Sequence, residues 1–278
     1  MLLRMDTVDV AGVRTTYLEA GTGSAVVLLH GSGPGVSAAS NWAGVIGALG
    51  ARHRVLAPDM PGFGFTDFRP DGDYDIKVWT GHLLGFLDAL GLERVALVGN
   101  SLGGAVALAL ALRHAERIER IVAMGTPVGE YPITPGLAAG RAYEPSPEAM
   151  RAVMEHFPYD PSLIDDAMVQ ARFAASDRPG AQDAMRCLLP APAADGGETI
   201  VRGLPESALA HVAMPVLILH GREDRVIPFE HALRLHRGIA DSELHAFGRC
   251  GHWVQLERRD GFVRQVLGFL GDGAPAGR

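Results

Sequence analysis

The chain has 278 residues, 47% of them hydrophobic, and a formal net charge of −7 at pH 7. This acidic balance argues against a nucleic-acid partner and against an anionic membrane surface, and no apolar run is long enough to span a bilayer. Two cysteines, Cys187 and Cys250, are too few for a disulfide framework, and the charge at Arg4 comes too early for a signal peptide. We therefore expect a cytoplasmic protein.

Strands and helices are expected to alternate along most of the chain. The pattern around Gly12 predicts a hairpin at a sheet edge, and the apolar run at 25–29 predicts a parallel strand that is covered on both faces. The expected elements, in chain order, are hairpin strands 7–10 and 13–19, strand 25–29, helix 41–49, strand 55–57, helix 76–90, strand 95–98, a helix from 102 to about 114, strand 121–124, strand 215–219, helix 229–237, strand 243–247 and helix 261–270. This order predicts an α/β fold with a mostly parallel, doubly wound sheet.

The alternation stops in residues 127–206. Prolines interrupt this stretch, and three segments have apolar residues at helical spacing, namely 147–157, 162–175 and 180–188. We interpret 127–206 as a helical cap inserted after the sixth strand of a core that comprises 1–126 and 207–278. Such a cap would cover the carboxyl ends of the strands, where parallel sheets bind their ligands. The Gly-, Pro- and Ala-rich tail after Leu270 is expected to be disordered.

A strand, a tight turn and a helix meet at Gly99-Asn100-Ser101-Leu102-Gly103. Apolar residues precede this motif and an Ala- and Leu-rich run follows it, which is the strand–turn–helix setting of a nucleophile elbow. The flanking glycines leave room for a strained backbone at the central serine. We predict that Ser101 is a nucleophile and that the N–H of Leu102 is one donor of an oxyanion hole.

A nucleophilic serine needs a base, and the base needs an orienting carboxylate, in the chain order Ser, Asp or Glu, His. Of the eleven histidines, His252 follows the last predicted strand, in a loop that can bend it toward Ser101. Asp224 follows the preceding strand and is predicted to be the carboxylate, whereas its neighbour Glu223 is interpreted as a surface charge. Asp59, between two prolines, is expected to hold its own loop.

Other polar residues at strand ends receive structural interpretations. His30 and His220 are expected to shape loops, and Cys250 is expected to pack in the interior. The Gly- and Pro-rich loop 30–35 is predicted to supply the second oxyanion donor through the N–H of Ser32. This loop lacks the Lys-Ser/Thr of a phosphate-binding loop, and no His, Cys and Glu cluster has metal-ligand spacing. Neither a nucleotide cofactor nor a metal is therefore expected.

Several segments together are similar to one known family: His30–Gly35, Asn41-Trp42, Pro58–Gly64, Gly99–Gly104, Gly221–Pro228 and Cys250–Trp253 in the core, with Pro132–Leu137, Phe157–Asp160 and Arg172–Ser176 in the cap. On these motifs the chain resembles the meta-cleavage product hydrolases, which are α/β-hydrolases of aromatic catabolism that cleave a carbon–carbon bond. The subgroup that it resembles most is the 2-hydroxymuconate-semialdehyde hydrolases.

The resemblance implies a substrate and residues that bind it. Arg172 matches the family position that binds the carboxylate and 2-oxo group of a small anionic dienoate. Asn41 and Asn100 match polar partners at the same end of the substrate, and Trp253 matches a pocket wall. The implied reaction tautomerises a 2-hydroxy-6-oxohexa-2,4-dienoate from dienol to ketone and cleaves its C5–C6 bond. The products are 2-hydroxypenta-2,4-dienoate and a small carboxylic acid, and no cofactor takes part.

Some questions stay open at this level. Close relatives in the family carry a tryptophan near the position of Arg141, so the wall around the C6 substituent differs here, and we favour hydrogen or a short alkyl group over phenyl. The same three residues would also serve a carboxylesterase, and a hydrolase fold can serve as a non-catalytic small-molecule receptor. The edge of the N-terminal hairpin would allow a homo-oligomer, either a dimer or a larger assembly.

Overall fold

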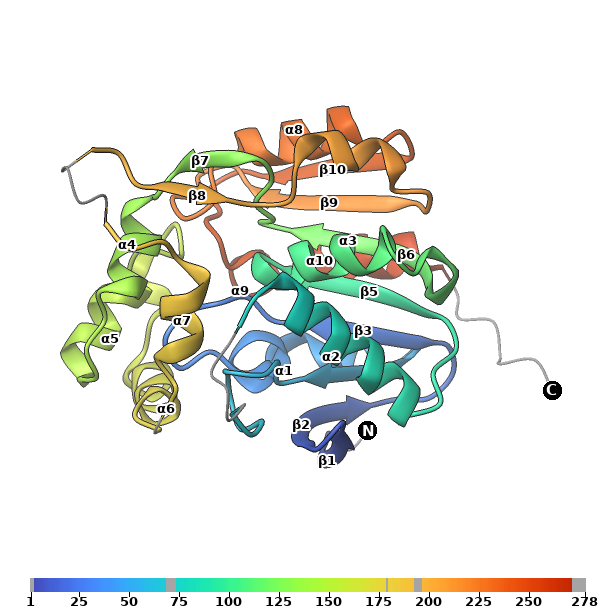
Figure 1. Ribbon diagram of the computed structural model, residues 1–278, viewed down its shortest axis with the longest axis horizontal. Coiled ribbons are helices and arrows are strands. Elements are labelled where there is room, and N and C mark those ends of the chain that lie inside the picture. Colours follow the sequence, from blue (N-terminus) through green and yellow to red (C-terminus); the bar gives the residue numbers. More distant parts are fainter. Residues whose placement is uncertain (1–2, 69–73, 179, 193–196, 272–278) are drawn as a thin grey trace.

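A single eight-stranded sheet organises the protein in the computed structural model, which describes residues 3–68, 74–178, 180–192 and 197–271. The tail beyond residue 271, expected to be disordered, lies outside the described residues. The strands are β1 (Arg4–Val10), β2 (Val13–Ala20), β3 (Ala25–Leu29), β4 (Arg54–Pro58), β5 (Val95–Asn100), β6 (Ile118–Met124), β9 (Val216–Gly221) and β10 (Ser242–Phe247). Their order across the sheet is β1-β2-β4-β3-β5-β6-β9-β10 (Figure 1).

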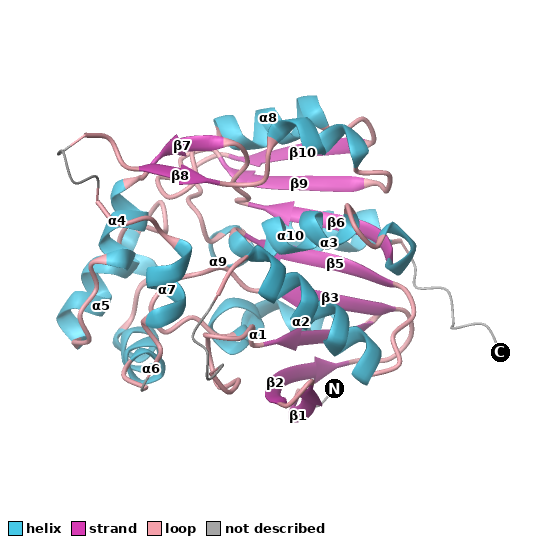
Figure 2. Ribbon diagram, viewed as in Figure 1, coloured by secondary structure: helices cyan, strands magenta, loops and turns pink. Residues whose placement is uncertain are grey.

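The predicted mostly parallel sheet is confirmed. Only the pairs β1–β2 and β2–β4 are antiparallel, and every other neighbouring pair runs in parallel. The antiparallel pairs form the N-terminal edge, where the predicted hairpin lies. Parallel strands need crossover connections, and these are the helices that cover the sheet (Figure 2). The sheet is covered by α1 (Ala38–Leu49), α2 (Ile76–Ala89), α3 (Leu102–Ala111) and α8 (Glu230–Gly238), and by α9 (Val254–Glu257) and α10 (Arg259–Leu270), which follow the last strand. Short 3-10 turns lie at η1 (Ala115–Arg117) and, in the long connection from β6 to β9, at η2 (Pro161–Leu163) and η3 (Glu206–His211).

The continuous apolar strands bury both of their faces. In β3, Val27 and Leu29 pack into the hydrophobic cluster that also holds residues of α2, α3 and α8. Their neighbours Val26 and Leu28 point to the other face and pack with residues of α1, α9 and α10. Because side chains alternate along a strand, an unbroken apolar run is what a sheet with helices on both faces requires.

The segment of the chain that connects β6 to β9 forms a second layer, which lies at the carboxyl ends of the parallel strands (Figure 1). It comprises β7 (Glu130–Pro132), α4 (Pro135–Arg141), α5 (Pro147–Met154), α6 (Asp166–Ser176), α7 (Asp183–Leu188) and β8 (Ile200–Arg202). The expectation of a purely helical cap was wrong in one respect, because β7 and β8 pair as a two-stranded antiparallel ribbon. Three-residue strands carry almost no periodicity, and their partners lie about seventy residues apart. We refer to this layer, from β7 to β8, as the cap.

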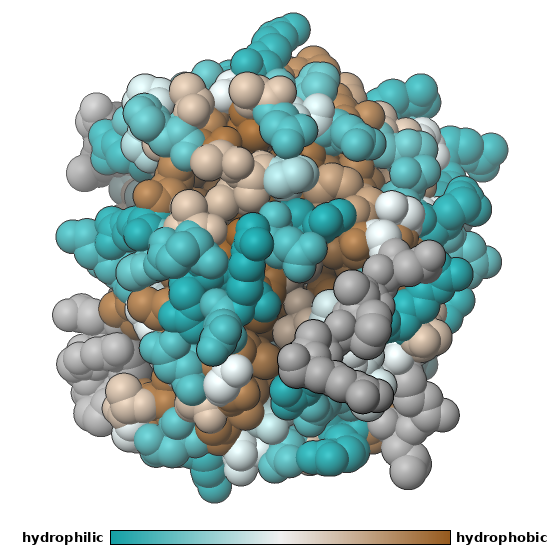
Figure 3. Space-filling model, turned by 90° about the vertical axis from the view of Figure 1, so that its right-hand side faces the viewer, coloured by the Kyte–Doolittle hydropathy of each residue, from teal (hydrophilic) through white to brown (hydrophobic). Residues whose placement is uncertain are grey.

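The side of the core that faces away from the cap carries hydrophilic residues over most of its rim, with hydrophobic residues visible between them (Figure 3). Among the helices in the described ranges, none combines the length and the apolar character needed to cross a membrane.

Candidate active site

Ser101 is the single residue that joins β5 to α3. Its backbone has φ 53° and ψ −115°, a strained conformation that a non-glycine residue rarely adopts. The turn is so tight that a Cβ on Gly99 would lie 2.4 Å from the backbone of Gly103. The N–H of Ser101 donates to the carbonyl of Met124 at the end of β6 (2.8 Å), which anchors the turn to the neighbouring strand. The backbone geometry therefore agrees with the predicted elbow.

Asp224 and His252 form a buried pair beside this turn. Oδ2 of Asp224 lies 2.6 Å from Nδ1 of His252, and its Oδ1 accepts hydrogen bonds from the N–H groups of Val226 (2.8 Å) and Ile227 (2.9 Å). Burial alone would raise the pKa of Asp224, but His252, His220 and the hydrogen bonds hold this pKa well below its usual range. The carboxylate is therefore an acceptor, so Nδ1 of His252 carries the proton and Nε2 is left as the basic atom.

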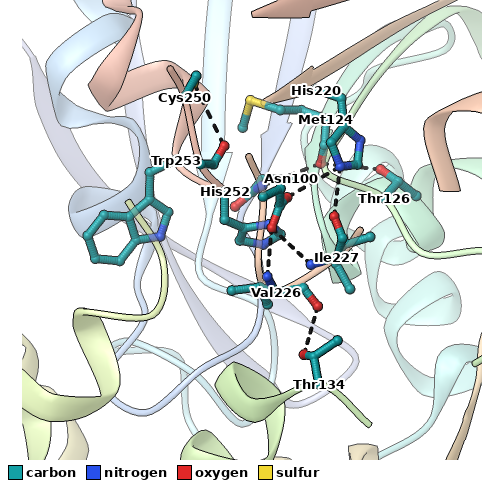
Figure 4. Close-up of polar contacts among 12 residues, drawn as sticks. Asn100, Met124, Thr126, Thr134, His220, Val226, Ile227, Cys250, His252 and Trp253 are labelled. Atoms are coloured by element: carbon teal, nitrogen blue, oxygen red, sulfur yellow. Dashed lines mark hydrogen bonds and ion pairs between the residues drawn. The ribbon is translucent and has the colours of Figure 1, made fainter. Parts of the chain in front are cut away.

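The imidazole of His252 also lies close to the serine turn. A Cβ on Gly125 would stand 3.0 Å from Nδ1 of His252, and Gly125 directly follows Met124, the residue that anchors Ser101. In Figure 4, the hydrogen bonds of Val226 and Ile227 gather beside this ring, whereas the indole of Trp253 points away from it. An arrangement of this kind can activate a serine hydroxyl for attack on a carbonyl carbon.

His220 has a role that the sequence analysis described only in part. Its Nε2 lies 2.8 Å from the carbonyl of Ile227, as expected for a residue that shapes the loop, but it also lies 3.4 Å from Oδ2 of Asp224. Because a carbonyl only accepts, Nε2 carries the proton and points it toward the carbonyl and the carboxylate. The position of His220 four residues before Asp224, at the end of a strand, was the available signal.

The loops around the site are held by buried polar groups. Nε2 of His30 accepts from the N–H of Met60 (2.9 Å), and its Nδ1 lies 2.7 Å from the carbonyl of Gly31. The carboxylate of Asp59 accepts from the N–H groups of Ala38 (2.5 Å) and Phe65 (2.7 Å), while burial raises its pKa to about 6. Both residues thus shape loops, as the sequence analysis proposed.

Two further interpretations concern the loop that carries His252. Burial raises the pKa of the Cys250 thiol, which is neutral and packed, in line with its interpretation as an interior residue. The interpretation of Glu223 as a surface charge was incomplete, because its Oε2 accepts from the N–H of Cys250 (3.1 Å). Glu223 therefore fastens one end of this loop, a role that the neighbouring sequence could not reveal.

Arg172 of α6 is buried, with no counter-ion among the described residues. Its Nε and Nη2 both donate to the carbonyl of Pro34 (3.3 and 3.0 Å), and its guanidinium lies 5.6 Å from the ring centroid of Trp253. Within the described ranges, no carboxylate lies within ion-pair distance of it. Burial lowers the pKa of Arg172 to about 10, so the group remains a cation near neutral pH. A buried, uncompensated cation of this kind is suited to an anionic ligand.

Asn41 and Asn100 meet at Gly31, in the same loop that Arg172 contacts. Oδ1 of Asn41 accepts from the N–H of Gly31 (3.2 Å), and its buried Nδ2 has no hydrogen-bond partner in the described structure. Nδ2 of Asn100 donates to the carbonyl of Met124 (3.3 Å), and its Oδ1 would lie 3.0 Å from a Cβ on Gly31. The four residues that the resemblance implied for substrate binding thus lie around one loop.

A cavity of about 300 Å³ opens at Ser101. Ser32, Ser101 and Leu102 line it, so the two predicted oxyanion donors and the serine share one wall. The remaining walls are mostly apolar and come from α2, α4, α7, β7, β8 and the segment after β9. Arg141 is not among the lining residues, and α4 contributes Leu137 instead. Asn41, Asn100, Arg172 and Trp253 do not line this cavity either. We refer to these four residues, which lie at or near the loop of residues 30–35, as the polar end, and to the cavity as the apolar end.

The fold and this geometry define an α/β hydrolase, and the family described as alpha/beta hydrolase fold matches residues 24–259. A 2-hydroxy-6-oxo-2,4-heptadienoate hydrolase of Pseudomonas putida is 48% identical over 260 residues, which cover 93% of each chain. A 2-hydroxymuconate semialdehyde hydrolase of Pseudomonas sp. (strain CF600) is 43% identical over 264 residues, covering 94% of this chain and 92% of the relative. The chain belongs to the meta-cleavage product hydrolases of the α/β-hydrolase fold.

A solved structure supports the same assignment. The meta-cleavage product hydrolase from Pseudomonas fluorescens superposes with a TM-score of 0.89 at 42% sequence identity, covering 95% of this chain and 97% of that one. The similarity therefore includes the cap as well as the core.

Proposed function

We propose that the protein hydrolyses the C5–C6 bond of 2-hydroxy-6-oxohexa-2,4-dienoates, which are ring-fission products of aromatic catabolism. The observation that carries this proposal is the buried Arg172 cation, which has no carboxylate partner among the described residues and contacts the loop of residues 30–35, whose Gly31 lies next to Ser101. A simple esterase has no need of such a group. Relatives at 48% and 43% identity carry the names of hydrolases for substrates of this class.

The polar end would bind the dienoate first. A guanidinium offers two parallel donors, which suit the planar carboxylate and 2-oxo pair of the substrate. The free Nδ2 of Asn41 is available as a further donor at the same end. His252 would carry the proton that converts the dienol to the ketone, which turns C5 into a stable leaving carbon once the C5–C6 bond breaks.

Ser101 would then attack the C6 carbonyl while Nε2 of His252 takes its proton and Asp224 stabilises the imidazolium. The N–H groups of Leu102 and Ser32 would receive the developing oxyanion, each with an effect on the order of 3 kcal/mol. Cleavage leaves an acyl-enzyme and releases 2-hydroxypenta-2,4-dienoate. Water activated by His252 frees the acid, so one water is consumed for each bond broken.

The C6 substituent would occupy the apolar cavity. We favour hydrogen or methyl, because the relatives named for the methyl and semialdehyde substrates share 48% and 43% of their residues with this chain, whereas one named for the phenyl substrate shares 36%. The two cysteines, the exposed Cys187 and the buried Cys250, are too few for a disulfide framework, which supports a reducing compartment such as the cytoplasm.

One assay tests the proposal. The yellow ring-fission products of catechol, 3-methylcatechol and 2,3-dihydroxybiphenyl are mixed with the enzyme, and the loss of colour is followed. We expect the first two to bleach faster than the third. If none of them bleaches while a p-nitrophenyl ester is still turned over, the protein is an esterase instead.

A further inference from the structure

The carboxylate of Glu257, the last residue of α9, holds the loop that carries His252 from both sides. Its two oxygens accept from the N–H of Gly251 (3.0 and 2.9 Å), and its Oε1 also accepts from the N–H of Trp253 (3.2 Å). These two residues flank His252 in the sequence. Hydrogen bonds from N–H groups to an ionised carboxylate are stronger than those to a neutral acceptor. A single side chain therefore holds the backbone on both sides of His252.

The same carboxylate reaches across to the cap. Its Oε2 accepts from the N–H of Tyr159 (2.7 Å), in the segment between α5 and α6. In that segment the carbonyl of Phe157 accepts from the N–H of His252 (2.7 Å). A Cβ on Gly251 would lie 2.3 Å from the Phe157 carbonyl oxygen, so the two backbones are in direct contact. Cap segment 157–159 and the His252 loop therefore meet at Glu257.

The part of the loop that precedes Gly251 is held independently of Glu257. Glu223 accepts from the N–H of Cys250 (3.1 Å), and the guanidinium of Arg258 donates to the carbonyls of Gly248 (2.9 Å) and Arg249 (2.7 Å). Loss of the Glu257 carboxylate would thus leave that part of the loop in place and loosen the segment that contains His252, which would keep its own contacts with Phe157 and Asp224.

We propose that Glu257 is a positioning residue that couples the seating of the cap to the placement of the His252 imidazole. It lines an open groove on the outer surface together with Tyr159 and Asp160, not the cavity at Ser101, so it acts through His252 and not on the substrate. The activity readout of this proposal rests on the proposed function, whereas the position of His252 is measurable in the free enzyme.

The first test is Glu257→Gln, which keeps the size of the side chain but turns one acceptor oxygen into a donor that faces N–H groups. We expect kcat for the dienoate to fall about tenfold or more, because small displacements of a catalytic group carry large rate penalties. KM should change by less than about threefold, since the polar end is untouched. In the free enzyme, the low-field proton NMR signal of the hydrogen bond between His252 and Asp224 should shift or broaden.

Asp160→Asn is the matched control. Asp160 lies in the same outer groove and its carboxylate accepts from the N–H of Ser162 (2.9 Å). In the described structure no hydrogen bond or ion pair joins its side chain to the His252 loop, and the charge of Arg249 acts on it only at longer range. This variant should keep kcat within about twofold of the wild type, with the low-field signal unmoved.

Glu257→Gln with wild-type kcat and an unmoved signal, in a protein that unfolds at the wild-type temperature, would overturn the proposal. If Glu257→Gln does not fold, Glu257→Asp takes its place, because it retains the charge and is one methylene too short to reach both Tyr159 and Gly251. A wild-type kcat and signal in that variant would equally overturn the proposal. If the wild-type enzyme bleaches no dienoate, the proposed function fails, and the NMR comparison still decides the role of Glu257.

Discussion

The polar and apolar ends of the site are built in different ways. At the polar end, Arg172, Asn41 and Asn100 are buried, and each donates to or accepts from a backbone group of a loop or strand end. At the apolar end, side chains of the cap and of α2 form the walls of the cavity. Under the proposed function, this difference teaches that fixed polar groups would recognise the common dienoate, whereas the shape of a mostly apolar cavity would recognise the variable substituent.

The largest expected effect comes from the group that both ends share. Ser101→Ala removes the predicted nucleophile, so dienoate and p-nitrophenyl ester turnover should fall together, by on the order of a millionfold in kcat. Dienoate binding should survive, because Arg172 is unchanged, and the visible spectrum of the bound substrate measures it. Residual ester turnover at more than about a thousandth of the wild-type rate would mean that another group attacks the ester.

Arg172→Ala should separate the two ends. Removal of a buried cation that pairs with a substrate anion costs about 2–5 kcal/mol, so kcat/KM for the dienoate should fall about 30-fold or more. Turnover of a neutral ester should change by less than about threefold, because no anion is present to pair with Arg172. Steady-state kinetics with both substrates measures the ratio.

The control for that prediction is Arg186→Ala, which removes an exposed arginine of the cap that forms an ion pair with Asp183 at 3.4 Å. It should leave both activities within about twofold of the wild type. Equal losses on dienoate and ester in Arg172→Ala would reject the carboxylate-binding role.

Leu188→Ala should alter the apolar end alone. Leu188 lines the cavity from α7, and its truncation would make room for a larger C6 substituent. A hydrophobic pocket discriminates by about 1–3 kcal/mol, so the ratio of phenyl to methyl substrate turnover should rise about tenfold. The rate with the semialdehyde should change least, since hydrogen makes few contacts with the wall. An unchanged ratio would place the substituent elsewhere.

The last prediction, which has the smallest expected effect on activity, is a pH dependence of folding stability that arises at His30, in the loop at the polar end. Burial lowers the pKa of His30 to about 4, and its Nε2 must stay unprotonated to accept from Met60. Below the usual pKa of about 6.5 the unfolded chain binds a proton that the native state refuses, so stability falls as the pH drops from 6.5 to 4. Between these two pH values the free energy of unfolding should fall by about 1.4 kcal/mol per pH unit.

His30→Gln replaces the imidazole with a group that does not titrate, so the free energy of unfolding of this variant should depend less on pH than that of the wild type. Urea unfolding of the wild type and the variant at pH 7, 6 and 5 measures the difference between their free energies of unfolding, and this difference should become smaller as the pH falls. His231, whose pKa burial also lowers to about 4, contributes equally to both proteins and cancels. Parallel curves would show that His30 is not the group responsible.

Which site residues could be predicted from the sequence depended on whether a local sequence pattern marks them. Ser101, Asp224 and His252 each follow a strand of the parallel sheet, so local patterns located them, and the structure joins Asp224 to His252 at 2.6 Å. Arg172 lies on a cap helix without a motif of its own, and only the family resemblance singled it out. The structure adds its burial and its lack of a carboxylate partner among the described residues, while its role remains a proposal.

Other features had no local signal. The ribbon of β7 and β8 pairs residues 130–132 with 200–202, and the contacts of Glu257 join α9 to the cap segment at Tyr159. Glu223 follows the end of β9, and nothing in its neighbours tells that it meets the N–H of Cys250. Contacts of this kind depend on how distant elements pack, which periodicity does not encode.

By itself, the sequence determined the alternation of strands and helices, the strained serine turn and the chain order of the predicted catalytic residues. These features follow from local chemistry, namely unbroken apolar runs, glycines where the backbone is tight and polar residues where strands end. Only the tertiary structure decided that a buried arginine stands without a carboxylate partner in the described ranges, that this arginine lies outside the lining of the cavity at Ser101, and that one carboxylate joins the cap to the His252 loop. The reason is physical: burial and charge compensation belong to the packed molecule and not to any segment of the chain.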